Sequence, residues 1–100
     1  MLLYQIEFAK AVKSHLDVLT PGQRSTVLRA IEKQLTNEPS KETRNRKPLR
    51  PNPVAPWELR VQQMRVFYEV NEGPPPVVQI LAVRIKTRVT LRIGGEEIKL

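Results

Sequence analysis

The hydrophobic residues in the second half of the chain follow a pattern that predicts three β-strands. In residues 57–61 and 64–70 the apolar side chains alternate with polar ones, as in strands with one buried face. Residues 62–63 separate these two stretches and predict a tight turn between antiparallel strands. A Gly-Pro-Pro-Pro break at 73–76 leads to a continuous apolar run at 77–83, which we expect to be a central strand covered on both faces.

The first part of the chain predicts a short strand followed by two helices. Residues 2–7 read as the strand, and in residues 8–19 apolar side chains recur every three or four positions, as on one face of a helix. A second helix is expected over 21–35, with Thr20 as its N-cap and Gln23 completing a capping box. Because the connection is short, the two helices should pack as an antiparallel hairpin.

The stretch between the helices and the paired strands, residues 37–56, contains five prolines and shows no apolar periodicity. Proline removes a backbone donor and disfavours helix in the residue before it, so we expect an extended connector. Leu49 and Val54 are expected to hold it to the core. It is also the most basic part of the chain, through Arg44, Arg46, Lys47 and Arg50.

This order of elements predicts the fold class. A strand, a helix pair and a three-strand meander give an α+β domain, residues 1–100, in which the N-terminal strand and the antiparallel helix hairpin pack on a small, mainly antiparallel sheet. The helix pair should cover one face of the sheet. The other face should then be a shallow, concave, basic surface.

Charge and composition narrow the possible partners. The chain has seventeen basic and ten acidic residues, a net charge of +7, and most of the positive excess lies from residue 41 onward. Such a charge favours a polyanion as the binding partner, either nucleic acid or an acidic protein. There are no cysteines and one histidine, so we expect no disulfide, metal site or cofactor. No apolar run reaches the roughly 18–20 residues of a membrane span, and the N-terminus does not resemble a signal peptide. A cytoplasmic protein is therefore expected.

The candidate functional residues are basic side chains on the predicted strands. A core strand avoids unpaired charge, so these residues mark either a solvated sheet face or an anion site: Arg60, Arg65, Arg84, Lys86 and Arg88. Two other groups that could transfer protons are expected elsewhere. Tyr68 falls on the core face of its strand, and His15 is expected on the helix pair, away from the sheet, as a structural residue.

The phrase KPL before the second strand, WELRV and MRVFYEV in the hairpin, and VVQILAVRIK in the following strand resemble the RelE/ParE superfamily of bacterial toxins. The resemblance covers nearly the whole chain. It implies a toxin of a toxin–antitoxin pair that is held inactive, in a hetero-oligomer, by an acidic antitoxin. RelE-like members are ribosome-dependent endoribonucleases that cut mRNA and thereby inhibit translation, so ribosome and mRNA are the implied partners.

The resemblance also implies roles for particular residues. Arg60, Arg65 and Lys86 match basic positions of the RelE catalytic site. Glu58 stands where many relatives have a lysine, and it could act as a base, as a carboxylate does in some of them. The implied RNA contacts are Arg84 and Arg88 beside Lys86, and the basic connector with Arg44, Arg46, Lys47 and Arg50. The C-terminal tyrosine or histidine of many active members is missing, and Arg92 lies near its place.

Two other functions stay open. ParE-like members of the superfamily poison DNA gyrase, a binding activity that needs no RNA chemistry. The chain could also be a catalytically inactive module whose basic sheet face binds RNA or an acidic protein through charge alone, in which case binding weakens steeply with salt.

Overall fold

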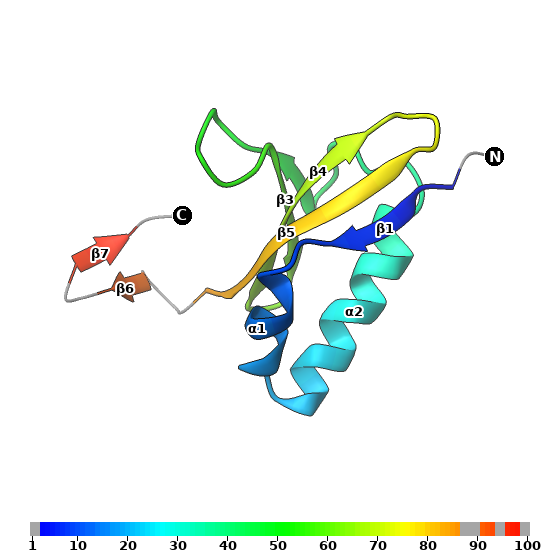
Figure 1. The fold of residues 1–100 in the computed structure, drawn as a ribbon. Coiled ribbons are helices and arrows are strands. Elements are labelled where there is room, and N and C mark those ends of the chain that lie inside the picture. Colours follow the sequence, from blue (N-terminus) through cyan, green and yellow to red (C-terminus); the bar gives the residue numbers. More distant parts are fainter. Residues whose placement is uncertain (1–2, 87–90, 94–95, 99–100) are drawn as a thin grey trace.

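The fold is built from helices and strands in the order β1 (Gln5–Phe8), α1 (Val12–Asp17), α2 (Pro21–Leu35), β2 (Arg46–Pro48), β3 (Trp57–Val61), β4 (Met64–Asn71), β5 (Val77–Ile85), β6 (Leu91–Ile93) and β7 (Glu96–Ile98) (Figure 1). The computed structural model describes residues 3–86, 91–93 and 96–98. The α+β class predicted from the sequence is confirmed.

Five of the strands form one mixed sheet in the order β1-β5-β4-β3-β2. The meander β3-β4-β5 and the edge strand β2 are antiparallel to their neighbours, whereas β1 pairs with β5 in parallel, with Gln5 opposite Val77. The apolar run that begins at Val77 is therefore an interior strand, as expected, although the central place belongs to β4. β6 and β7 form a separate antiparallel pair.

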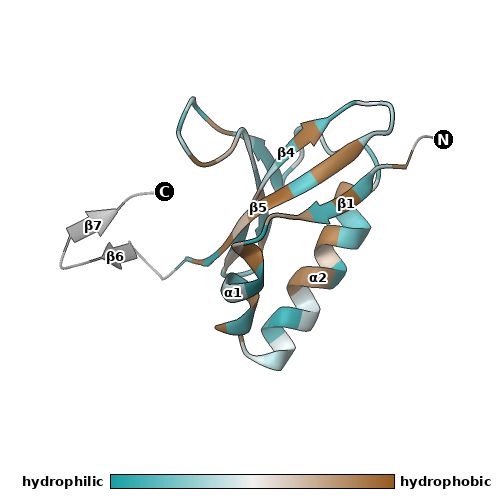
Figure 2. Ribbon diagram, in the orientation of Figure 1, coloured by the Kyte–Doolittle hydropathy of each residue, from teal (hydrophilic) through white to brown (hydrophobic). Residues whose placement is uncertain are grey.

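Both helices lie on one side of the sheet (Figure 1). α2 begins as its sequence predicts, because the Thr20 side chain accepts a hydrogen bond from the Gln23 amide at 3.1 Å and the Gln23 side chain accepts one from the Thr20 amide at 3.0 Å. α1 is only six residues long. Figure 2 shows the hydrophobic side of α2 turned toward the sheet. Within the described ranges, no helix is both long and apolar enough to cross a membrane.

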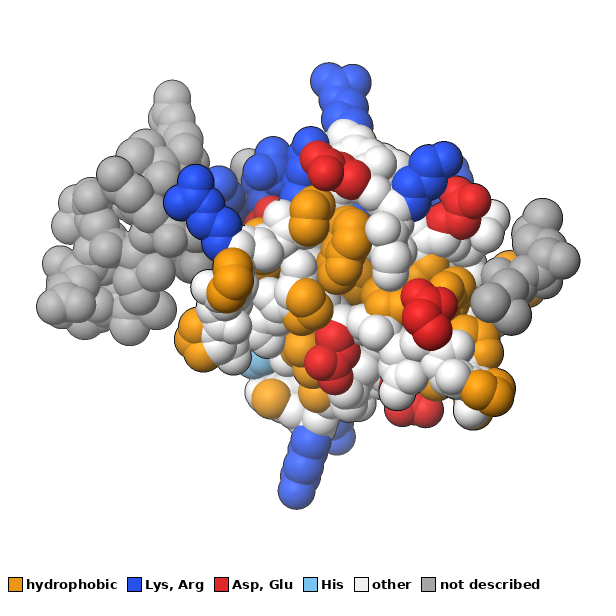
Figure 3. Space-filling model, turned by 90° about the horizontal axis from the view of Figure 1, so that it is seen from above, with side chains coloured by type: hydrophobic (Ala, Val, Ile, Leu, Met, Phe, Trp, Pro, Cys, Tyr) orange, Lys and Arg blue, Asp and Glu red, His pale blue; other side chains and the backbone are white. Residues whose placement is uncertain are grey.

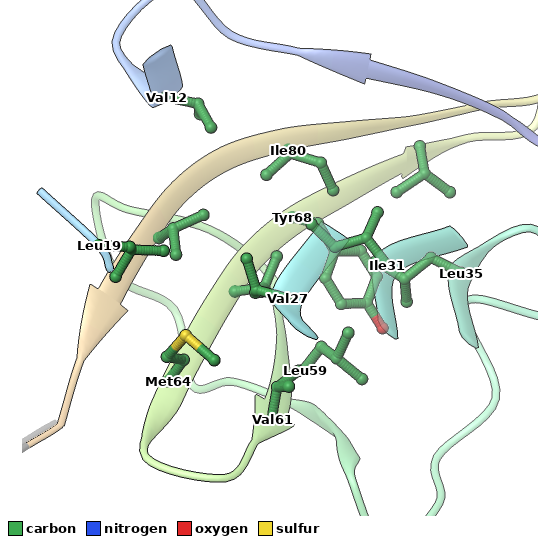
Figure 4. Close-up of a cluster of buried hydrophobic side chains, with 13 residues drawn as sticks. Val12, Leu19, Val27, Ile31, Leu35, Leu59, Val61, Met64, Tyr68 and Ile80 are labelled. Atoms are coloured by element: carbon green, nitrogen blue, oxygen red, sulfur yellow. The ribbon is translucent and has the colours of Figure 1, made fainter. Parts of the chain in front are cut away.

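The main core lies between the helices and the sheet (Figure 4). Val27, Ile31 and Leu35 of α2 are buried against residues of β3, β4 and β5. At one end of this core the Tyr68 ring is fully buried and stacks on Trp57 with ring centroids 6.1 Å apart. Its hydroxyl donates a hydrogen bond to the Pro39 carbonyl at 2.8 Å, which attaches the connector to the sheet and confirms the core position expected for Tyr68.

A smaller apolar cluster covers part of the opposite face. Ala55, Phe67 and Ala82 are buried together, with Leu49 and Leu81 packed against them. A β-bulge in β5, between the pairs Phe67–Ala82 and Tyr68–Ile80, adds Leu81 to this face. Leu49 and Ala55 of the connector thus cover part of the face that was expected to be open. Val54 is about half exposed and Ala55 takes the buried place expected for it.

Two local predictions were wrong. Phe8 ends β1 and does not begin a helix, because Ala9 still donates a hydrogen bond to the Ile80 carbonyl at 2.8 Å and so continues the pairing of β1 with β5. The connector contains the short strand β2, which pairs with β3 at the edge of the sheet. Pro48 is tolerated there because an edge strand can lack one backbone donor.

Candidate functional site: a row of arginines across the sheet

Three arginines lie side by side on the sheet. Arg60 of β3 is the cross-strand partner of Arg65 of β4, and Arg65 is the partner of Arg84 of β5. Directly opposed residues point to the same face with their Cβ atoms about 5 Å apart, and like charges in such pairs destabilise a sheet. We call Arg60, Arg65 and Arg84 the arginine row. Three positive charges at this spacing favour a bound anion.

One carboxylate partly neutralises the arginine row. Glu58 of β3 is buried, and its oxygens lie 3.6 Å from Arg60 Nε and 3.6 Å from Arg65 Nε. At this distance the contacts are ion pairs and not hydrogen bonds. The Arg65 side chain is 13% exposed and that of Arg60 is 48% exposed. Arg65 is therefore a fixed charge inside the site, whereas the Arg60 guanidinium is open to solvent and to a ligand.

The turn between β3 and β4 fixes Arg65 further. Arg65 Nη1 donates hydrogen bonds to the carbonyls of Gln62 and Met64, both at 2.9 Å. Gln62 adopts a positive φ of 56°, which a non-glycine residue tolerates at a cost of about 1 kcal/mol or more. The Lys86 amide donates to the Gln63 carbonyl at 2.6 Å, so the end of β5 and Arg65 both bind this turn. The backbone of Lys86, a residue expected at the site, therefore lies beside this turn.

His15 is not where the sequence analysis placed it. α1 brings its ring to the edge of β5, where the Val83 amide donates to Nδ1 at 3.3 Å and Arg84 Nη1 lies 3.0 Å from Nε2. Burial, and secondarily the positive charge of Arg84, hold the pKa of His15 below its ordinary 6.5. The neutral ring is therefore favoured over the imidazolium. Helix periodicity could not show this contact, because it depends on where β1 ends along β5.

The basic residues of the connector divide into two groups. Arg44 and Arg50 are exposed, and Lys47 lies 3.5 Å from Glu42. Arg46 instead turns inward: its guanidinium donates to the carbonyls of Gln34 at 2.5 Å, Asn37 at 3.3 Å and Lys41 at 3.1 Å. Through these bonds from Nε and Nη1, Arg46 holds the connector against the C-terminal end of α2. Arg88 lies outside the described residues.

The arrangement suits binding and charge neutralisation better than proton transfer. Guanidinium groups match phosphate oxygens and stay protonated. Glu58 is 8% exposed and paired twice, and burial raises the pKa of Tyr68 far above its usual range. Figure 3 shows the molecule from above, with most of the visible Lys and Arg side chains along its upper border, others at the lower border, and hydrophobic side chains in the middle. Among the described side chains, no group of three His, Cys, Asp or Glu is arranged to hold a metal ion.

The fold is similar to those of chains in two solved toxin–antitoxin complexes. The RelBE2 toxin–antitoxin complex from Mycobacterium tuberculosis contains a similar chain, with a TM-score of 0.73 and 26% identity, over 86% of this chain and 94% of that one. The archaeal RelE–RelB complex from Pyrococcus horikoshii contains another, with a TM-score of 0.69 and 22% identity, over 88% of this chain and 100% of that one. We found no family model and no curated protein that matches the sequence.

These matches show that the chain has a RelE-like fold. This confirms the resemblance that the strand sequences indicated.

Proposed function

We propose that this chain is the toxin of a toxin–antitoxin pair and acts in the cytoplasm as a ribosome-dependent mRNA endoribonuclease that inhibits translation. The observation that carries the proposal is the arginine row, held by Glu58 and by the β3–β4 turn on a RelE-like sheet. A row of cations fixed on rigid strands can follow a phosphate backbone, and fixed positions make charge stabilisation efficient.

The reaction needs a group that accepts a proton, a group that donates one, and positive charge near the phosphorus. An RNA 2′-hydroxyl loses a proton and attacks the adjacent phosphorus in line, the phosphorus–O5′ bond breaks, and the O5′ atom gains a proton. The five-coordinate phosphorus between these steps carries extra negative charge, which the guanidiniums of Arg60, Arg65 and Arg84 and the ammonium of Lys86 would neutralise. A ribosome that orients the mRNA would contribute several kcal/mol more through positioning, which suits a site with few acid–base groups.

The proposed partner is an acidic antitoxin. The two similar chains are found in toxin–antitoxin complexes, and this chain carries a net charge of +7. An acidic protein that covers the arginine row would supply the negative charge that this surface favours and would block RNA at the same time. The exposed Arg44 and Arg50, with Lys47, would extend the contact with RNA along the connector.

The test is induction of the chain alone in a bacterial host, with mapping of mRNA 5′ ends. We expect growth arrest and new cuts inside translated codons. Arg60→Gln and Arg84→Gln, which change solvent-accessible members of the row, should reduce the cuts strongly, and so should Lys86→Ala. Arg29→Gln is a matched control, because it removes one charge from α2 on the opposite side of the sheet.

The outcomes separate the alternatives. If both row variants stay fully toxic, the assignment of the site is wrong. Arrest with a DNA-damage response and without cuts would select the gyrase reading. A chain that causes no arrest, and binds RNA or an acidic protein with a steep salt dependence, would be a binding module.

A further inference from the structure

His15 of α1 lies at the edge of β5, beyond the point where β1 stops pairing with that strand. The pairing of β1 with β5 ends at Phe8 opposite Ile80, and Ala9 adds one last hydrogen bond to the Ile80 carbonyl. Beyond this point the edge of β5 is free to meet α1, and the His15 ring lies there between the Val83 amide and the Arg84 guanidinium. The ring thus lies against both the backbone of β5 and one end of the arginine row.

The two contacts depend on the protonation state of the ring. A neutral imidazole has one acceptor nitrogen, so it can accept from one of the two donors at a time. The imidazolium has no acceptor, so it can accept from neither and would place a second positive charge 3.0 Å from Arg84 Nη1. The contact with Arg84 Nη1 is the shorter of the two, 3.0 Å against 3.3 Å for the Val83 amide, which favours Arg84 as the donor.

The charges around His15 come from several elements. Arg84 of β5 is the charged side chain that contacts the ring among the described residues. Arg24 of α2 donates to the carbonyls of Leu16 and Leu19, next to His15, at 3.0 and 3.1 Å. Lys13 and Asp17, two residues to either side on α1, are exposed. Of these charged groups, Arg84 is the one that opposes protonation of the ring.

We propose that His15 is a positioning residue of the site: its neutral ring holds the Arg84 guanidinium in line with Arg65 and Arg60, and protonation of the ring releases it. This inference rests on the proposed function for its catalytic consequence. Acidification should then weaken the binding of a phosphate group at the site, although every arginine stays charged. The rate of mRNA cleavage would then decrease as the pH falls through the pKa of His15.

The pairing can be tested without any activity, because the chain has a single histidine. The imidazole Cε1–H signal is followed by NMR against pH, in the full chain prepared by cell-free synthesis without a histidine tag. We expect the pKa of His15 to lie below 6.5 and to rise in Arg84→Met. Arg60→Met, which removes the same charge at the other end of the row, should move it much less. If Arg84→Met leaves the pKa of His15 where it was, the proposal is overturned.

The positioning role is tested with two substitutions that each replace one ring nitrogen. Asparagine places its amide near Nδ1 and glutamine near Nε2, so His15→Gln preserves an acceptor for Arg84 and His15→Asn does not. In a translation reaction with purified ribosomes, His15→Asn should cut mRNA about tenfold more slowly, the effect of losing a hydrogen bond to a charged group. His15→Gln should retain most of the rate. Thermal unfolding shows whether each variant is folded.

The pH profile completes the test. Because ribosomes themselves respond to pH, the informative quantity is the ratio of the wild-type rate to the His15→Gln rate between about pH 5 and 8. This ratio should fall at the pKa measured for His15 by NMR. Equal rates in all three chains and a constant ratio would overturn the positioning role while leaving the proposed function intact. If the wild-type chain cuts no mRNA, the proposed function fails, and the NMR titration still decides whether His15 and Arg84 are paired.

Discussion

Replacing Glu58 by glutamine removes the negative charge between Arg60 and Arg65 and preserves the shape of the side chain. The substitution acts mainly through Arg65. The Arg65 side chain is 13% exposed and its Nε lies 3.6 Å from Glu58. This buried Nε has no hydrogen-bond partner in the described part of the chain. Water cannot replace the lost carboxylate there. Arg60, which is 48% exposed, remains solvated.

The size of the effect follows from these distances. Two opposite charges about 4 Å apart attract each other by about 4 kcal/mol at an effective dielectric constant of 20. The loss of stability should be smaller than this attraction, because the Arg65 guanidinium keeps its hydrogen bonds to the Gln62 and Met64 carbonyls. We therefore expect Glu58→Gln to lower the free energy of unfolding by about 2 to 3 kcal/mol. Arg60→Gln should change it by less than about 1 kcal/mol, as for exposed ion pairs.

Urea unfolding followed by Trp57 fluorescence measures these changes, since Trp57 is the single tryptophan and stacks on Tyr68 in the core. Urea is preferred because guanidinium is a salt that screens charges. The Glu58→Gln and Arg65→Met variants and their combination give a double-mutant cycle, and we expect a coupling energy of about 2 kcal/mol. Glu69→Gln, an exposed carboxylate on β4, is the control. A coupling below about 0.5 kcal/mol would show that Glu58 does not hold Arg65.

Three further substitutions test the fold around the site. Tyr68→Phe should cost about 1 kcal/mol of stability, because the Pro39 carbonyl loses its donor; an unchanged urea midpoint would contradict that hydrogen bond. Thr20→Ala should lower stability by about 1 kcal/mol through loss of the α2 cap, and Thr20→Ser should restore most of it. Because the pKa of His15 is lower in the fold than its ordinary 6.5, the unfolded chain binds the proton first on acidification; wild-type stability should therefore fall, relative to His15→Gln, as the pH drops below about 7. A difference between the two chains that stays constant with pH would refute this.

The parts of the fold that the sequence predicts well are those set by neighbouring residues. Thr20 and Gln23 make both hydrogen bonds of the predicted capping box, since a cap needs only residues three positions apart. The alternation in residues 57–61 and 64–70 places the correct side chains in the core, because the period of a strand is local. The same alternation predicted the face of the sheet on which Arg60 and Arg65 lie.

The parts that were missed depend on contacts between distant segments. Residues 46–48 form a strand because β3 offers them an edge, and nothing in RKP itself indicates this. Arg46, expected to contact RNA, binds the end of α2 because the connector returns there. His15 reaches the arginine row because β1 stops at Phe8 and exposes the edge of β5. A short helix gives no sign in its own sequence of which strand edge it will meet.

The parallel pairing of β1 with β5 has a consequence for how the protein folds. Gln5 lies opposite Val77, so this contact closes a loop that contains most of the chain, and contacts between such distant residues form slowly. The arginine row has a similar requirement, because Arg84 joins Arg65 only when β5 pairs with β4. A nascent chain that ends before β5 has an unpaired edge on β4 and two of the three arginines. The surface proposed to bind RNA is thus completed only after β5 has been synthesised and has paired with β4.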